Sequence, residues 1–249
     1  NHTILAEALE KWPLASLRKV SPAIADIIVK LDEIAKAEHD DPRVAIIDEH
    51  DTVHMAHMDI HFGFSINGVP TPLRGVSRHQ DRVFEGNALT AEEHYDDAML
   101  IKELGANTIR LAHYQHSQDF YDACDEIGFA VWAEIPFISV FKKGEGAHKH
   151  VMEEMKELII QNYNHPSIMF WGISNEILIG GISQELVDTH HDLEKLCKEL
   201  DPTRLTTIAH VSTTPVNGPM HHITDLESYN HYFCLLYTSP SPRDGATSR

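Results

Sequence analysis

The chain has 249 residues, with 38 acidic against 20 basic side chains and a formal net charge of -18 at pH 7. So acidic a chain argues against nucleic acid and against an anionic membrane surface as partners. Its length suffices for one large α/β domain or two smaller ones.

Neither a metal nor another cofactor is expected. Two histidine groups are close in sequence: His54, His57 and His61, and His221 and His222. Neither has a carboxylate at ligand spacing, and no HExxH motif occurs. The three cysteines lack CxxC spacing, and neither a leader nor an apolar run of about 20 residues occurs. These features predict a cytoplasmic protein without disulfides or membrane spans.

Residues 1–61 are predicted to form a helical segment. Ser21 is a suitable N-cap, Pro22 suits the first turn, and apolar residues recur at helical spacing from Ile24 to Ala35. A shorter helical stretch precedes it around residues 4–11. No catalytic motif occurs there, so a packing role is expected. The origin of the segment is open, and one alternative is a piece of another gene joined to the rest.

From residue 62 to 233 strand and helix patterns alternate. "PLRGVSRH" (72–79) is the first strand. A helix follows, with Thr90 and Glu93 as a capping box, an apolar face of Met99, Leu100 and Leu104, and a stop at Gly105. Further helices are predicted at 117–128, 148–166 and 183–202, and strands at 107–114, 129–136, 167–176, 204–211 and 226–233.

Several of the six predicted strands are mostly apolar rather than alternating, as in a parallel sheet covered by helices. Both a doubly wound sheet and a (β/α)8 TIM barrel fit this pattern. Polar residues end the strands, where a barrel assembles its active site. They are Arg78, His79, Arg110, His113, Glu134, Asn175, Glu176 and Tyr232. We therefore expect an incomplete TIM barrel with about six of eight strands, and two further βα units beyond it.

Residues 234–249 differ from this pattern. Cys234 to Asp244 back-translates to a nucleotide sequence that resembles a transposase-type sequencing adapter. We expect this tail to be artefactual, and the natural protein to continue differently.

The apolar run "FWGISNEI" (170–177) ends in adjacent amide and carboxylate groups. Partial desolvation of Glu176 at a strand end favours the protonated carboxyl that a general acid needs. Asn175 can hydrogen-bond a sugar hydroxyl. This pairing suits glycoside hydrolysis. The alternative is that Glu176 caps a loop or pairs with an arginine.

Longer stretches carry a specific resemblance. "GFSINGVPTPLRGVSRHQD", "NHPSIMFWGISNEI" and "DLESYNHYF" resemble glycoside hydrolase family 2, most closely its β-galactosidases, and the similarity runs from about Gly63 to Phe233. It implies a (β/α)8 barrel and a retaining double displacement. It also implies that Glu176 is the acid/base and that Asn175 binds a sugar hydroxyl.

The same resemblance assigns further residues. His79 and His113 match histidines that hold galactose hydroxyls. Arg110 matches an arginine whose charge keeps the nucleophile ionised, and Tyr232 matches an aromatic hydroxyl near it. For His79, His113 and Tyr232 the alternative is a structural hydrogen bond at the barrel rim. Glu134 supports the acid/base or forms a structural pair.

Three features depart from the family. The nucleophile is expected on a strand beyond residue 233, so no residue here is assigned that role. Residues 1–61 do not match the family's all-β N-terminal domains. The family's magnesium ligands have no counterpart after "WAEIPFIS" (132–139), so no metal is expected.

We therefore expect a fragment of a retaining exo-β-galactosidase that acts on a small carbohydrate and is inactive alone. A β-glucuronidase or another family 2 β-glycosidase is the alternative among enzymes. A non-catalytic sugar-binding or structural fragment is the alternative outside them. The resemblance allows a homo-oligomeric parent enzyme.

Overall fold

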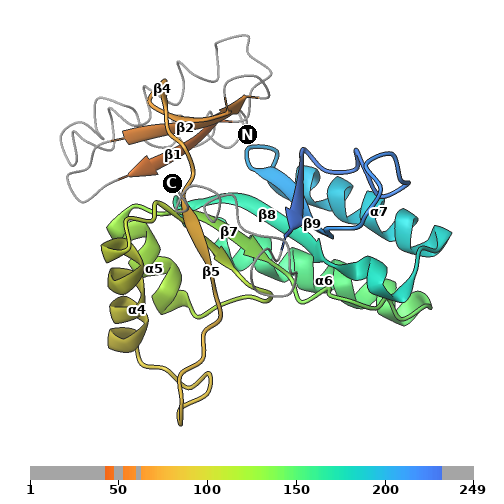
Figure 1. The fold of residues 1–249 in the computed structure, drawn as a ribbon, viewed down its shortest axis with the longest axis horizontal. Helices are drawn as coiled ribbons and strands as arrows, with labels where there is room; N and C mark the ends of the chain where they lie inside the picture. Colours follow the sequence, from red (N-terminus) through yellow and green to blue (C-terminus); the bar gives the residue numbers. More distant parts are fainter. Residues whose placement is uncertain (1–42, 48–52, 60–62, 232–249) are drawn as a thin grey trace, which may run out of the picture.

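The computed structural model describes residues 43–47, 53–59 and 63–231, which form two sheets (Figure 1). One is a four-stranded antiparallel sheet, and the other is a six-stranded parallel sheet covered by helices. Among the described residues, no helix has both the length and the apolar character needed to cross a bilayer.

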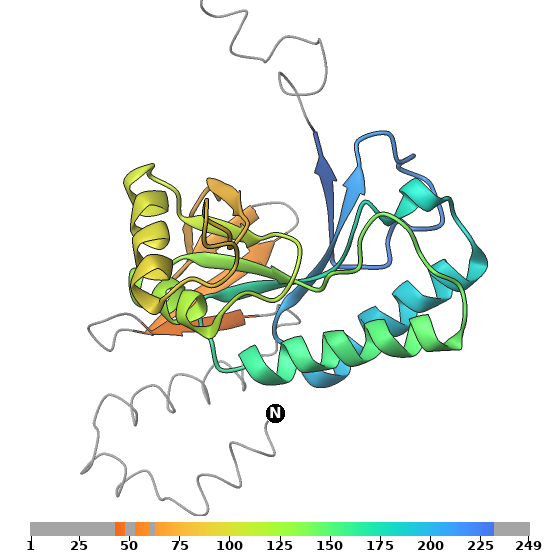
Figure 2. The same ribbon diagram turned by 90° about the horizontal axis from the view of Figure 1, so that it is seen from below.

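The six parallel strands follow one another in sequence order across the sheet. They are β5 (Gly75–Arg78), β6 (Thr108–Leu111), β7 (Ala130–Glu134), β8 (Ile168–Asn175), β9 (Leu205–Val211) and β10 (Leu226–Asn230). The sheet curls into a half-barrel (Figures 1 and 2), so the predicted incomplete TIM barrel is confirmed. All six predicted strands are present.

Four helices connect the first five of these strands and cover the sheet. They are α4 (Ala91–Glu103), α5 (Gln118–Ile127), α6 (Glu145–Asn162) and α7 (Gln184–Leu200), and a short 3-10 helix, η1 (Ile177–Gly180), follows β8. α4 packs beside α5, and α6 beside α7 (Figures 1 and 2). The predicted capping box is present, because the Thr90 hydroxyl accepts the Glu93 N–H and the Glu93 carboxylate accepts the Thr90 N–H.

The buried face of α4 is not the one that its largest apolar residues suggest. Met99, Leu100 and Leu104 are 38%, 59% and 76% exposed, whereas His94 and Ala98 are buried. The Arg78 guanidinium at the end of β5 donates to His94 Nδ1 at 3.0 Å. This polar contact turns the face that carries His94 toward the sheet.

The antiparallel sheet corrects part of the N-terminal prediction. Two of its strands, β1 (Arg43–Ile47) and β2 (Val53–Asp59), lie within residues 1–61, which were expected to be helical. β2 pairs with β3 (Gly63–Ile66), a partner beyond that segment, and β3 pairs with β4 (Val69–Pro70). Helical spacing within the segment could not reveal this long-range pairing. The two helices predicted upstream lie outside the described residues.

Strand β3 closes the N-terminal end of the half-barrel. Its Phe64 is 7% exposed, and the Phe64 and Phe170 ring centroids lie 6.5 Å apart. The same apolar cluster includes Ala130, Met169, Leu205 and Leu226, which lie at the beginnings of their strands. Apolar side chains thus gather at this end of the half-barrel, and the polar residues at the ends of the strands lie at the opposite, C-terminal end.

A cavity of about 400 Å³ lies inside the curl of the sheet. It is lined by Leu73, Gly75, Val76, Ser77, Thr108, Arg110, Trp132, Phe170, Thr207, Leu226 and Ser228. Gly172 lets two large side chains approach there: a Cβ on Gly172 would lie 2.3 Å from Trp132 Nε1 and 2.6 Å from Glu134 Cβ. Both contacts are far below van der Waals distance.

Replacing Gly172 with alanine should therefore destabilise the fold by about 1–3 kcal/mol, the usual cost of overpacking. Thermal unfolding of Gly172→Ala measures this loss. Gly146→Ala is the matched control, because nothing lies within 4 Å of a Cβ at that position in α6. Equal melting temperatures for the two variants would contradict the close packing described around Gly172.

Candidate active site

The guanidinium of Arg110 links the end of its own strand, β6, to the ends of three other strands of the sheet, β7, β8 and β10. Its Nη2 donates to Glu134 Oε2 on β7 at 3.0 Å and to Asn175 Oδ1 on β8 at 2.7 Å. Its Nη1 donates to Asn230 Oδ1 on β10 at 3.0 Å. The Arg110 side chain is 11% exposed and that of Glu134 is fully buried. The Arg110–Glu134 ion pair is thus almost completely buried. Together with the hydrogen bonds to Asn175 and Asn230, it connects the strands at the C-terminal edge of the sheet.

His113 shares the Glu134 carboxylate with Arg110. Its Nδ1 lies 2.6 Å from Glu134 Oε1, so Nδ1–H donates and Nε2 is left for another partner. The His79 ring meets the His113 ring edge-on, with centroids 5.4 Å apart, and His79 is exposed. Of the two roles considered for Glu134, the structure shows the structural pair, with Arg110 and His113.

Glu176 follows β8 directly in a left-handed backbone conformation with φ 49°. Few non-glycine residues adopt this conformation, and they cluster at functional sites. The Glu176 carboxylate is half-buried, and its Oε1 accepts the Asn230 side-chain N–H at 2.9 Å. Asn230 also donates to Asn175 Oδ1 at 2.9 Å. The amide of Asn175 is thus oriented with its oxygen toward Arg110 and Asn230.

A buried histidine supports the strand that carries this pair. His190 Nδ1–H donates to the Leu186 carbonyl at 2.8 Å, so its Nε2 accepts the Ser174 hydroxyl, also at 2.8 Å. Both His190 and Ser174 are fully buried. Burial lowers the pKa of His190 to about 4, so the imidazole is neutral at pH 7.

The structure brings together five of the six site residues predicted from the sequence: His79, Arg110, His113, Asn175 and Glu176. The sixth, Tyr232, lies outside the described residues. The chemical roles given to these residues stay predictions. Asn230 was missed, although it stands in the same "YNHYF" motif that singled out Tyr232.

The comparisons with known proteins divide the chain into two overlapping parts. The model of the carbohydrate phosphorylases matches residues 1–74. A maltodextrin phosphorylase of Streptococcus pneumoniae is 65% identical over 69 residues, which are 28% of this chain and 9% of that protein. This similarity supports a separate origin for the N-terminal segment, which stays a prediction.

The Arg110–Glu134 pair yields a double-mutant prediction. Arg110→Met should cost about 3–5 kcal/mol of stability, because it leaves the Glu134 carboxylate buried without its cation. Adding Glu134→Gln should restore part of that loss, since a neutral amide is less costly to bury. Urea unfolding of both single variants and the double variant measures the coupling. Strictly additive losses would contradict the central role given to this pair.

The low pKa of His190 predicts acid sensitivity. The unfolded chain takes up a proton near pH 6.5 and the folded one only near pH 4, so stability falls as the pH is lowered through this range. The expected loss is about 3 kcal/mol. Unfolding free energies of the wild type and His190→Gln between pH 7 and 4 measure it. An equally steep decline in both proteins would argue against His190 as the group responsible.

The rest of the chain matches one family. The model described as "Glycosyl hydrolases family 2, TIM barrel domain" matches residues 61–239. A β-glucuronidase of Bacteroides fragilis is 40% identical over 183 residues, 71% of this chain and 26% of that protein. A β-galactosidase of Thermoanaerobacterium thermosulfurigenes is 37% identical over 147 residues, 58% of this chain and 19% of that protein.

A solved structure described as an FMN-binding β-glucuronidase from Facaelibacterium prausnitzii L2-6 superposes with a TM-score of 0.69 and 80% sequence identity. The superposition covers 72% of this chain and 29% of that one. The chain thus spans only about a quarter of the length of such relatives. Sequence and fold agree that the chain belongs to glycoside hydrolase family 2 and carries part of its TIM-barrel domain.

Proposed function

We propose that the full-length protein containing residues 63–231 is a retaining β-glycosidase in which Glu176 is the acid/base. The observation that carries this proposal is the Asn175–Glu176 pair at the end of β8, fixed by Arg110 and Asn230. A half-buried carboxylate beside an oriented amide can transfer a proton while the amide holds the sugar.

The reaction has two steps. In the first, Glu176 gives its proton to the glycosidic oxygen. The bond between this oxygen and the anomeric carbon breaks as a second carboxylate bonds to that carbon. In the second, Glu176 removes a proton from water, whose oxygen attacks the anomeric carbon and releases the second carboxylate. The second carboxylate is expected on a later strand of the barrel, about 5 Å from Glu176. Arg110 would favour its ionised form through its charge.

The remaining site residues are suited to hydrogen-bond the uncharged hydroxyl groups of the sugar. Because His113 Nδ1–H is held by Glu134, its Nε2 can accept a hydrogen bond from a hydroxyl group. The Asn175 NH2 group can donate to a second hydroxyl, since its oxygen is already bonded to Arg110 and Asn230. The exposed His79 beside His113 extends this polar edge.

Similarity to known proteins supports β-glucuronides as the first candidate substrates. The relative at 40% identity and the solved structure at 80% identity are both described as β-glucuronidases. β-Galactosides, the substrates first expected from the sequence, are the second candidate, supported by the relative at 37% identity described as a β-galactosidase. We expect the residues that would bind a glucuronide carboxylate to lie downstream of the described chain.

The test uses the full-length protein. Glu176→Gln should lower kcat/KM about 100- to 10,000-fold for a glycoside whose leaving group needs protonation. The loss should be much smaller for a dinitrophenyl glycoside, whose leaving group departs without a proton. Glu199→Gln, an exposed site on α7, is the matched control and should retain activity.

Two results would contradict this proposal: full activity in Glu176→Gln, or equal losses for both leaving groups. The same preparations compare nitrophenyl β-glucuronide with nitrophenyl β-galactoside. A higher kcat/KM for the glucuronide is expected. A higher value for the galactoside would assign the second candidate substrate while leaving the role of Glu176 intact.

A further inference from the structure

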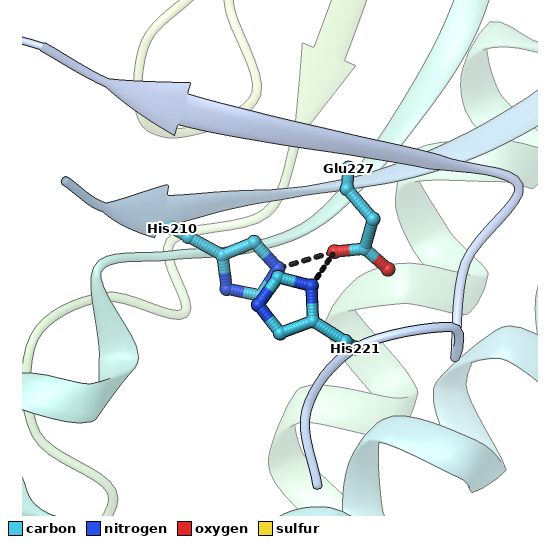
Figure 3. Close-up of side chains that lie close together, drawn as sticks. All are labelled: His210, His221 and Glu227. Carbon is cyan, nitrogen blue, oxygen red and sulfur yellow. Dashed lines mark hydrogen bonds and ion pairs between the residues drawn. The ribbon is translucent and has the colours of Figure 1, made fainter. Parts of the chain in front are cut away.

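Three potential metal ligands converge on the face of the sheet that points away from the barrel cavity. Thr207, Leu226 and Ser228 line the cavity, so the alternating residues of β9 and β10 point outward. These outward residues include His210 and Glu227. The loop between the two strands brings His221 onto the same face (Figure 3).

The donor atoms of the three side chains point at one another. One donor atom each of His210, His221 and Glu227 lies within 4.8 Å of the other two. The two imidazole rings are stacked, with centroids 4.6 Å apart and planes 20° from parallel. One nitrogen of each ring faces the Glu227 carboxylate (Figure 3). His210 and His221 are 2% and 8% exposed. The two imidazoles are therefore shielded from bulk water, and the Glu227 side chain is 20% exposed.

The carboxylate of Glu227 is oriented by a second group, as in metal sites where outer partners orient the ligands. The backbone N–H of His222 donates to Glu227 Oε1 at 2.8 Å, which leaves Oε2 directed at the histidines. The Tyr229 hydroxyl lies 3.0 Å from His221 Nε2 and 3.5 Å from its Nδ1, and the Tyr229 ring stacks on the His221 ring.

The distance between His221 and Glu227 suits two ligands of one cation better than a hydrogen bond. His221 Nδ1 lies 3.7 Å from Glu227 Oε2, which is too long for a hydrogen bond. Ligands around tetrahedral Zn²⁺ are separated by roughly 3.3–3.5 Å. His210 Nε2 contacts Glu227 Oε2 directly, so this pair has to separate to admit an ion.

We propose that His210, His221 and Glu227 bind a divalent cation of the Zn²⁺ class and that the ion fastens the β9–β10 loop to the sheet. Two imidazoles and one carboxylate form a donor set that Zn²⁺ favours. The net charge of -18 draws cations to the protein. The site was not expected from the sequence, because His210 and Glu227 are separated by 17 residues.

A second group of potential metal ligands among the described residues lacks the burial of the first. Asp122, Asp125 and His165 are also close together. However, the Asp122 side chain is 73% exposed, and Asp125 is engaged by His165 and by the Ser167 N–H. These contacts tie the segment before β8 to α5, which is a sufficient role for the group.

The test titrates Zn²⁺ into the metal-free 249-residue chain by calorimetry. One saturable ion that depends on His210 is expected. A hundredfold excess over the Kd should raise the melting temperature by about 5–10 °C. Co²⁺ should give visible absorption bands of a tetrahedral site. His210→Ala and Glu227→Gln should abolish both signals.

His150→Ala is the matched control, because His150 is an exposed histidine on α6 and its loss should leave binding unchanged. Glu227→Gln keeps the shape and hydrogen-bonding capacity of the side chain, so circular dichroism should show a folded protein that has lost the ion. Absence of saturable binding, or binding that survives both His210→Ala and Glu227→Gln, would overturn the proposal. Zn²⁺ binding only at other histidines would also overturn the proposal.

Discussion

The ion pair between Arg110 and Glu134 is the constraint on which the candidate site depends. Burying a carboxylate and a guanidinium is costly unless each is fully paired, so the strand ends must lie where their hydrogen bonds can all form. Arg110 meets that condition by contacting Glu134, Asn175 and Asn230 at once. The position of Glu176 follows, because Asn230 contacts both Asn175 and Glu176.

Strand β10 carries two groups of polar residues on opposite faces. Asn230 points into the barrel edge and reaches Glu176, whereas Glu227 points outward to His210 and His221. The alternation of side chains along a strand makes this separation possible. An ion that fastens the outer face would therefore also restrain the strand that positions the acid/base, although the two sites share no residue.

Much of the barrel could be predicted from the sequence because its signals are local. Continuous apolar runs mark the buried strands, and the Thr90–Glu93 capping box marks the start of α4. What could not be predicted depends on distant partners. The buried face of α4 is set by Arg78, β2 is set by pairing with β3, and the role of Asn230 is visible only when β10 lies near β8.

The most direct test of the central claim is a crystal structure of the full-length protein with an unreactive substrate analogue bound. The account predicts a Glu176 carboxyl oxygen about 3 Å from the glycosidic oxygen, with the Asn175 NH2 group on a sugar hydroxyl. A sugar bound away from the C-terminal ends of β5 to β8, or a Glu176 side chain directed outward between the helices, would contradict it.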